Sequence, residues 1–176
     1  MTITLIRHTS VAVATGVCYG QSDVEVSSTF EAEAQVVYSK LQDRIFDAVY
    51  CSPFVRCRRL AGYCGFPDPI LDHRLMELNF GAWEMKPWTA IKDPQLQRWF
   101  DNWMAEIPTE GESFRAMTSR VACFLEEVQK LKLQHVAIFT HAGVIRALGV
   151  ITHEFKINQS FDYDIQYGDV KQINIS

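Results

Sequence analysis

The chain begins with a short apolar segment, Thr2–Ile6, that ends abruptly on the charged pair Arg7 and His8. A run of this length that is rich in β-branched residues predicts a buried strand, and the change to charge marks where the strand leaves the core. Ligands of open α/β sheets bind just beyond the carboxyl ends of the strands. There a guanidinium can bind a phosphate or carboxylate, and an imidazole can attack or transfer a proton. Taken alone, the pair also fits an ordinary polar strand end.

A second segment, late in the chain, repeats this pattern. His135–Thr140 is the clearest buried strand of the sequence, and His141 follows it just before an apolar helix expected over Val144–Ile151. Strands that are separated by helices form a largely parallel sheet through right-handed crossovers, so their carboxyl ends share one edge. The sequence therefore predicts an α/β fold with a mostly parallel central sheet, in which His8 and His141 lie at the same edge.

A third strand is expected over Phe46–Cys51. Ser52 and Pro53 follow it and predict a helix N-terminus, with the serine as cap residue and the proline in the first turn. Arg56 lies one turn inside this helix, where its side chain can reach back over the strand ends and bind an anion. An exposed surface charge is an equal alternative for Arg56, and it is the favoured interpretation for the two arginines that follow.

Periodicity and turn residues place the remaining elements. These are a long loop over Thr9–Ser27, a helix over about Thr29–Gln42 with a capping box at Ser28 and Glu31, a short strand within Pro69–Asp72, a helix over Pro94–Met104, a long amphipathic helix from Phe114 to Leu131, and a hairpin or a pair of edge strands within Ser160–Ser176. A loop as long as 9–27 is often functional, although an ordinary connection is an equal alternative. The aromatic residues of the 94–104 helix either cover a site or, as we favour, belong to the core.

Glu77 and Glu84 are the acidic residues of a mixed segment, Arg74–Glu84, that also carries a glycine and several aromatic residues. The pattern fits neither a helix nor a strand, and it predicts a loop packed against the body of the protein. A carboxyl group among large apolar side chains keeps its proton more readily, as a general acid requires. Without further argument, a surface position beside buried aromatic residues is a slightly better interpretation of either acid.

Length and composition narrow the possible functions. The 176 residues are expected to form one domain, 1–176, and the formal net charge of -4 provides no broad basic surface for a nucleic-acid partner. Neither a membrane-spanning apolar run nor a basic and apolar leader is visible, so we expect no membrane partner and a cytoplasmic location. The five cysteines form no C-x-x-C pair, which argues against a disulfide framework. No cluster of Cys and His has the spacing of a zinc site.

At the shared sheet edge, four side chains would converge: Arg7, His8, Arg56 and His141. Two guanidinium groups and two imidazoles make a pocket for a phosphoryl group, whose oxygens need charge-assisted donors as they gain charge during transfer. One histidine can be the nucleophile and form a covalent phosphoryl intermediate. A nearby acid has to protonate the departing alcohol and then deprotonate the attacking water, and Glu77 is the candidate. Because the arginines and the second histidine supply the charge, neither a metal nor a cofactor is expected.

These motifs occur together in the order of a known family. They are Arg7-His8 after an apolar strand, Ser52-Pro53 followed by Arg56, Glu77 before Phe80-Gly81-x-Trp83-Glu84, Gly111-Glu112-Ser113, and Thr140-His141-x-Gly143. Over essentially its whole length, the chain resembles the histidine phosphatase superfamily, which is also called phosphoglycerate mutase-like. The resemblance implies a three-layer α/β/α sandwich with His8 as the phosphorylated nucleophile. It also implies that Arg7, Arg56 and His141 hold the phosphoryl group and that Glu77 is the proton donor.

Within the superfamily, Cys18–Asp23 and Leu78–Glu84 look most like the α-ribazole-5′-phosphate phosphatases, which act late in the assembly of the cobalamin nucleotide loop. This resemblance implies a metal-independent phosphomonoesterase for a small phosphorylated metabolite, with α-ribazole 5′-phosphate preferred. A phosphatase of sugar phosphates, phosphoglycerate or nucleotides is the alternative within the enzyme class. A non-catalytic module that binds phospho-ligands is the alternative from another class, and the presence of His8 and Glu77 argues against it.

Three positions depart from the usual family pattern. Thr9 stands where glycine usually follows the nucleophilic histidine, Arg59 stands where a threonine is frequent, and Ala142 stands where many members have glycine. None of these changes removes a group needed for phosphoryl transfer, so they bear on the substrate. The residues expected to contact the substrate are Thr9, Tyr19, Gly20, Gln21 and Ala142, although for Tyr19 or Gln21 taken singly ordinary packing is the favoured interpretation. An exposed strand in the C-terminal tail could pair across a homodimer, or its charges could simply protect a sheet edge.

Overall fold

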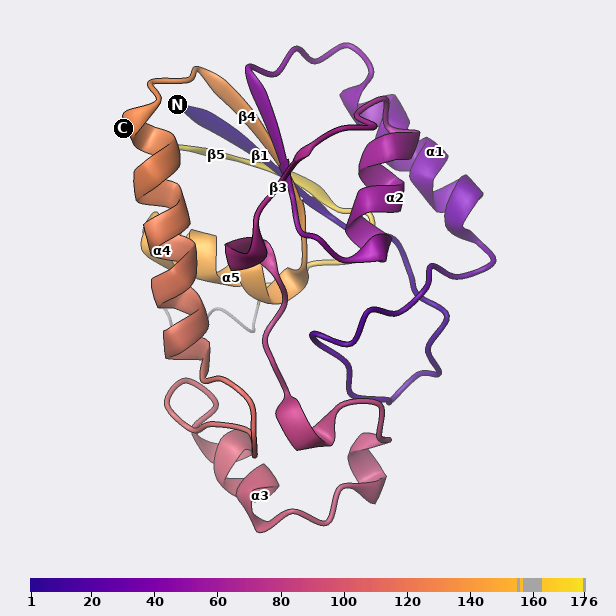
Figure 1. Ribbon diagram of the computed structural model, residues 1–176, viewed down its shortest axis with the longest axis vertical. Coiled ribbons are helices and arrows are strands. Elements are labelled where there is room, and N and C mark those ends of the chain that lie inside the picture. The colour runs from indigo at the N-terminus through magenta and orange to yellow at the C-terminus, as the bar shows by residue number, and fades with distance from the viewer. Residues whose placement is uncertain (155, 157–162, 176) are drawn as a thin grey trace.

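A five-stranded sheet forms the centre of the protein in the computed structural model, which describes residues 1–154, 156 and 163–175. The strands follow the order β3-β2-β4-β1-β5 across the sheet (Figure 1). Their bounds are β1 Thr2–Arg7, β2 Ala48–Cys51, β3 Ile70–Leu71, β4 His135–Thr140 and β5 Val170–Asn174. Strands β1 to β4 pair in parallel, and β5 pairs antiparallel with β1. The predicted mostly parallel sheet is therefore confirmed.

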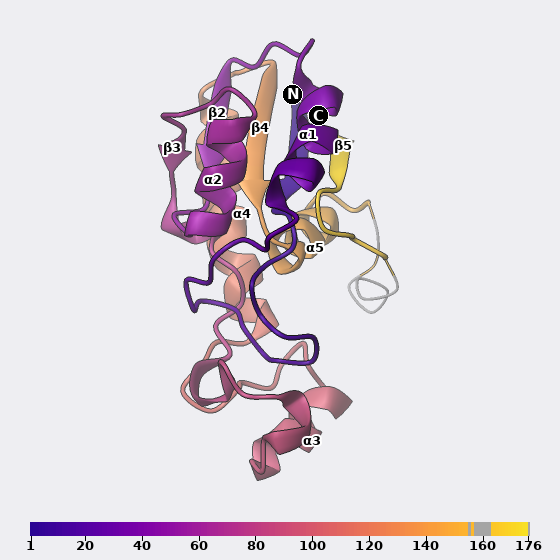
Figure 2. The ribbon, with the colours of Figure 1, turned by 90° about the vertical axis from the view of Figure 1, so that its right-hand side faces the viewer.

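Helices cover both faces of the sheet because the central strands carry apolar side chains on both sides. The helices are α1 Phe30–Leu41, α2 Val55–Tyr63, α3 Pro94–Asp101, α4 Phe114–Lys130 and α5 Ala142–Ile151. On one face, Ile3 and Leu5 share a core cluster with residues of α4 and α5. On the other face, Ile6 and Phe139 share a cluster with residues of α1 and α2. Figure 1 and Figure 2 show the sheet between these two pairs of helices, which is the expected three-layer sandwich.

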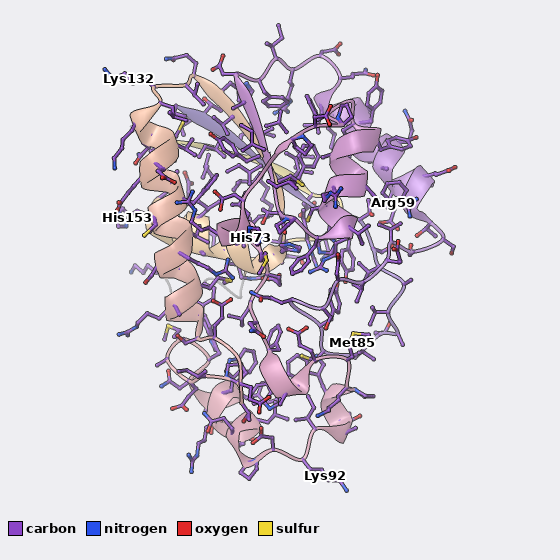
Figure 3. The ribbon with its side chains drawn as sticks, viewed as in Figure 1. Arg59, His73, Met85, Lys92, Lys132 and His153 are labelled. Atoms are coloured by element: carbon purple, nitrogen blue, oxygen red, sulfur yellow. The ribbon has the colours of Figure 1, made fainter. Side chains whose placement is uncertain are left out.

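The segment between β3 and α4 extends beyond the carboxyl edge of the sheet (Figure 1). It contains α3 and three 3₁₀ turns, η1 His73–Leu75, η2 Gly81–Trp83 and η3 Trp88–Ala90. Figure 3 shows Met85 and Lys92 in this part of the molecule, at the opposite end from Lys132, which follows α4. Five aromatic rings of the segment form one cluster, Phe80, Trp83, Trp88, Trp99 and Phe100, and Trp103 packs separately on Phe114 of α4. Trp99 is buried, as the favoured core interpretation of α3 requires, whereas Phe100 is half exposed.

Two predicted helix N-termini are wrong. Helix α1 begins after Thr29 without a side-chain cap, so the expected capping box within 28–31 does not form. The Thr29 hydroxyl bonds instead to the carboxylate of Glu33, one turn further along. Helix α2 also begins without a side-chain cap, because the hydroxyl of Ser52 lies 2.8 Å from the ring of His141 on the neighbouring strand end.

Other predicted boundaries differ by a few residues, as is usual at the ends of elements. Strand β2 begins at Ala48 rather than Phe46, and α3 ends at Asp101 rather than Met104. In the C-terminal tail, β5 is the second arm of the expected pair, but residues 163–167 form no strand. Two carbonyl groups of that stretch accept hydrogen bonds from arginine side chains instead of a neighbouring strand. The start of the predicted first arm lies outside the described residues.

No helix in the described part of the chain combines the length and apolar character that crossing a membrane requires.

Candidate active site

His8 lies directly after β1, at the carboxyl edge of the sheet. The parallel register places Arg7 beside Thr140 of β4, so that His8 and His141 are the next residue on each strand. Their ring centroids are 5.1 Å apart, and both side chains are buried. The two strand ends that the sequence singled out therefore meet in the structure.

The ring of His8 has one nitrogen engaged and its lone pair on the other. Nδ1 lies 2.7 Å from the backbone carbonyl of Thr9, which can only accept, so Nδ1 carries the proton and Nε2 the lone pair. Burial, together with the charges of Arg56 and Arg7, holds the pKa of His8 well below its ordinary value of 6.5. The imidazole is therefore neutral at neutral pH, which is the form that can act as a nucleophile.

Arg56 is fully buried, and its guanidinium lies between the long loop and the second histidine. Nη2 donates to the carbonyl of Gly20 at 2.6 Å, and Nη1 donates to the carbonyl of Ser22 at 2.9 Å. Nε donates to Nδ1 of His141 at 3.4 Å. A guanidinium has more N–H groups than these bonds use, so one on each terminal nitrogen is left for a ligand. The structure thus places Arg56 over the strand ends, whereas Arg59 is exposed on α2 (Figure 3).

His141 has both ring nitrogens engaged. Because Nδ1 accepts from Arg56, the proton of the neutral imidazole is on Nε2, which donates to the hydroxyl of Ser52 at 2.8 Å. Burial, together with Arg56 and His8, holds the pKa of His141 well below its ordinary value. Sequence reasoning missed this role of Ser52, because a serine before a proline is a strong local signal for a helix cap. Its position at the end of β2, beside β4, is the signal that points to His141.

Two buried polar atoms without a hydrogen-bond partner flank His8 in the sequence. Among the described residues, the buried side-chain atoms in this condition are Nε of Arg7, Oγ1 of Thr9, Nη1 of Arg44 and Nε1 of Trp99. A buried donor that is left unpaired costs about 1–3 kcal/mol, so native proteins rarely keep one without a reason. Because Arg7 and Thr9 lie immediately before and after His8, their unpaired atoms are candidates to donate to a bound anion.

Glu77 is held at the N-terminus of α5. Its Oε2 accepts from the N–H of Gly143 at 3.1 Å, and its Oε1 accepts from the N–H of Leu78 at 2.9 Å. A side chain at position 143 would collide with the carboxylate, since a Cβ there would lie 2.1 Å from Oε1. The backbone carbonyl of Glu77 accepts from the side chains of Gln21 and Arg120. The predicted proton donor is thus fixed at the same edge of the sheet as the histidines.

Tyr167 completes the site, although no sequence motif marks it. Its ring centre lies 3.9 Å from the guanidinium carbon of Arg7 and 5.6 Å from the ring centre of His8. Its phenol bonds to the phenol of Tyr19 over 2.6 Å, and burial and this bond raise the pKa of Tyr19. The antiparallel pairing of β5 with β1 brings Tyr167 to His8. No local sequence pattern predicts this contact between distant parts of the chain.

The other residues expected to contact the substrate have varied surroundings. Gly20 presents its carbonyl to Arg56, and the side-chain amide of Gln21 donates to the carbonyl of Glu77 at 3.1 Å. Ala142 is the first residue of α5 and is buried. Substrate contacts by these residues stay a prediction. Within the described residues, no three His, Cys, Asp or Glu side chains are grouped as a metal site would require.

Comparison with known proteins assigns this geometry to a family. The sequence profile described as "Histidine phosphatase superfamily (branch 1)" matches residues 3–176. The chain belongs to the histidine phosphatase superfamily. It is a phosphatase, and the resemblance inferred from the motifs is confirmed.

Individual relatives agree with this assignment. The adenosylcobalamin/alpha-ribazole phosphatase of Salmonella typhimurium is 30% identical to the chain over 157 residues, which are 84% of this chain and 77% of the relative. The crystal structure of the alpha-ribazole phosphatase from Shigella flexneri has a TM-score of 0.91 at 25% identity, covering 100% of this chain and 91% of its own. A phosphoglycerate mutase from Thermus thermophilus has a TM-score of 0.79 at 27% identity, covering 99% and 93%. The phosphoglycerate mutase-like fold is therefore confirmed.

Proposed function

We propose that this phosphatase hydrolyses a small phosphomonoester without a metal ion, through a covalent phosphohistidine on His8. The observation that carries the proposal is the state of His8, which is buried and neutral and has its lone pair on Nε2 beside two arginines. Cations around a neutral nucleophile favour attack on phosphorus, because they stabilise the negative charge that gathers on the phosphoryl oxygens.

The reaction would proceed in two steps with one acid–base group. In the first step, Nε2 of His8 attacks phosphorus, the N–P bond forms and the ester P–O bond breaks, while the leaving oxygen takes a proton from the Glu77 carboxyl. In the second step, a water oxygen attacks phosphorus and gives a proton to the Glu77 carboxylate. The N–P bond breaks and inorganic phosphate leaves, so that both residues return to their starting state.

Arg7 and Arg56 would hold the phosphoryl oxygens through both steps. His141 would join them by giving to a phosphoryl oxygen the Nε2–H that it donates to Ser52 before a ligand binds. Arg56 has an unused N–H on each terminal nitrogen, and the Nε of Arg7 has no protein partner. The hydroxyl of Thr9 would add a neutral donor next to the nucleophile. The carbonyls of Gly20 and Ser22 in the long loop anchor Arg56 before any ligand binds, so its donors need little reorganisation during the reaction.

The substrate that we propose is α-ribazole 5′-phosphate, used in the assembly of the cobalamin nucleotide loop. Support comes from the likeness to the Salmonella and Shigella enzymes and from the two segments that most resemble such phosphatases, Cys18–Asp23 and Leu78–Glu84. In the structure these segments touch, since a Cβ on Gly20 would lie 1.9 Å from the carbonyl oxygen of Leu78. A broader phosphatase of sugar phosphates, phosphoglycerate or nucleotides is the alternative, and the likeness to a phosphoglycerate mutase favours it.

Phosphate release from a panel of monoesters, with a chelator present, tests the proposal. The panel contains α-ribazole 5′-phosphate, 3-phosphoglycerate, phosphoserine, sugar phosphates and mononucleotides. We expect kcat/KM for α-ribazole 5′-phosphate to exceed the others at least about a hundredfold, which corresponds to roughly 2.7 kcal/mol of discrimination. A flat profile would keep the phosphatase but contradict the substrate. Activity that the chelator removes and added metal restores would contradict the metal-free mechanism, and no release from any ester would favour a binding module.

A further inference from the structure

Glu84 takes no part in the proposed reaction, yet its carboxylate has four hydrogen bonds next to the site. Oε1 accepts from the backbone N–H groups of Gln21 at 2.8 Å and Phe80 at 3.1 Å. Oε2 accepts from the N–H and the hydroxyl of Ser22, both at 2.5 Å. Burial raises the pKa of Glu84, but the hydrogen bonds outweigh burial and hold this pKa below its ordinary range. The group is therefore a carboxylate at neutral pH.

The loop that Glu84 binds is the loop that binds Arg56. The peptide group between Gly20 and Gln21 belongs to both contacts, since its N–H donates to Glu84 and its carbonyl accepts from Nη2 of Arg56. Ser22 joins the same two groups through the residue and not through one peptide group: its N–H and hydroxyl donate to Glu84, and its carbonyl, which belongs to the next peptide group, accepts from Nη1 of Arg56. A trans peptide group is planar, with its N–H and carbonyl pointing in opposite directions. An anchor on the N–H side therefore aims the carbonyl on the other side.

Close packing leaves this loop little freedom to find another position. A Cβ on Gly20 would lie 1.9 Å from the carbonyl oxygen of Leu78 and 2.8 Å from the ring of Phe80. The loop thus lies directly against the backbone of the segment that carries Glu77. Since Glu84 also binds the N–H of Phe80, one carboxylate links the loop of the phosphate-binding arginine to the segment of the proton donor.

We propose that Glu84 is a positioning residue of the phosphoryl site, which aims the guanidinium of Arg56 through the Gly20–Gln21 peptide group and Ser22. A carboxylate on the N–H of a peptide group also polarises its carbonyl and strengthens the bond that this carbonyl accepts. Without the carboxylate, Arg56 would keep its charge but lose its fixed direction. The proposal rests on the proposed function only in taking Arg56 to bind the phosphoryl group.

A double-mutant cycle on phosphate binding tests the role of Glu84. Glu84→Gln keeps the size of the side chain but replaces one accepting oxygen by an NH₂ group, which cannot accept from an N–H. We expect the Kd of inorganic phosphate, measured by titration calorimetry, to rise about tenfold in Glu84→Gln and about a hundredfold in Arg56→Met. In the Arg56→Met background, Glu84→Gln should change Kd less than about twofold. A tenfold effect in both backgrounds would overturn the proposal.

Asp93→Asn is the matched control. The carboxylate of Asp93 lies in the same part of the molecule and accepts three hydrogen bonds, from the side chains of Trp83 and Thr109 and from the N–H of Gln95. We expect Asp93→Asn to lower the stability of the fold without changing the Kd of phosphate. If Asp93→Asn weakens phosphate binding as much as Glu84→Gln does, the effect of Glu84 is a general loosening of this region and the proposal is wrong.

Two further choices keep the experiment decisive. Arg56→Lys replaces Arg56→Met in the cycle if the methionine variant does not fold, because lysine keeps the charge but cannot bind the carbonyls of Gly20 and Ser22 together in the same fork.

The binding of phosphate can be measured without any turnover, so this test does not depend on the proposed reaction. A wild-type protein that binds phosphate but hydrolyses no monoester would contradict the proposed function, while the cycle would still decide the role of Glu84.

Discussion

His8 and His141 occupy equivalent positions after neighbouring parallel strands, yet their surroundings give them different chemistry. The Nδ1 of His8 donates to a backbone carbonyl and leaves a lone pair on Nε2, whereas Nδ1 and Nε2 of His141 are both bonded, to Arg56 and Ser52. Both rings are buried and have a lowered pKa, so charge does not distinguish them. The hydrogen-bond partners do. A nucleophile needs an unengaged lone pair, and a supporting group needs a fixed ring.

Replacement of each histidine by asparagine should separate the two roles most strongly. We expect His8→Asn to lower kcat by at least about 10⁴-fold and to abolish the acid-labile phosphoenzyme, because no nucleophilic nitrogen remains. His141→Asn should lower kcat by about 10²–10³-fold and still form the phosphoenzyme, because it removes the Nε2–H that would turn from Ser52 to the phosphoryl oxygens and the ring that accepts from Arg56. Rapid quench with radiolabelled substrate measures both. A phosphoenzyme on the His8→Asn variant would contradict the assignment of the nucleophile.

Ser52→Ala should loosen His141 and leave His8 unchanged. The change leaves the Nε2–H of a buried imidazole without its acceptor, which should lower the free energy of unfolding by about 1–3 kcal/mol in urea titrations. Ser39→Ala is the control, because the Ser39 hydroxyl bonds to a carbonyl within exposed α1 residues, and it should change stability by less than about 0.5 kcal/mol. Equal stability of the two variants would argue against the bond to His141.

Acid should destabilise the protein through both histidines. Each has a lower pKa in the folded protein than in the unfolded chain, so below about pH 6.5 the unfolded chain binds more protons and the free energy of unfolding falls. Above pH 6.5 this contribution is constant. Unfolding titrations between pH 7.5 and 5.5 should show a slope of up to about 1.4 kcal/mol per pH unit for each histidine, and the His141→Asn variant should lose its share. An unchanged slope in that variant would contradict a neutral, buried His141.

Thr9→Val tests the residue that follows His8. The equivalent residue after His141 is Ala142, which has no hydroxyl. Valine keeps the β-branched shape and removes the unpaired hydroxyl, so stability should stay equal or rise by up to about 1 kcal/mol. If the hydroxyl of Thr9 donates to the phosphoryl group, the Kd of inorganic phosphate should rise about fivefold, as for a hydrogen bond of roughly 1 kcal/mol. Unchanged phosphate affinity would show that the hydroxyl points elsewhere.

Local sequence patterns were sufficient to predict the strand ends of the site. The apolar runs before His8 and His141 are two adjacent parallel strands. For Arg56 the local pattern left a surface charge as an equal alternative, and the structure shows it buried beside His141. The same kind of local reasoning failed for Ser52, which was interpreted as a helix cap. A serine hydroxyl can hydrogen-bond either to a helix N-terminus or to the ring of a neighbouring histidine. Which of the two bonds forms at Ser52 depends on the position of the adjacent strand β4, which brings His141 to it.

The sheet edge, the candidate cationic side chains and the family resemblance follow from the sequence alone. Strand periodicity is a pattern of neighbouring residues, and the order of the motifs is visible along the chain without any contact between them. The three-dimensional structure was needed to show which histidine keeps a free lone pair, that Tyr167 joins the site, and that Glu84 binds the loop of Arg56. Each of these depends on contacts between residues far apart in the chain. The direction of a hydrogen bond across such a contact is set by packing, and no pattern of neighbouring residues carries that information.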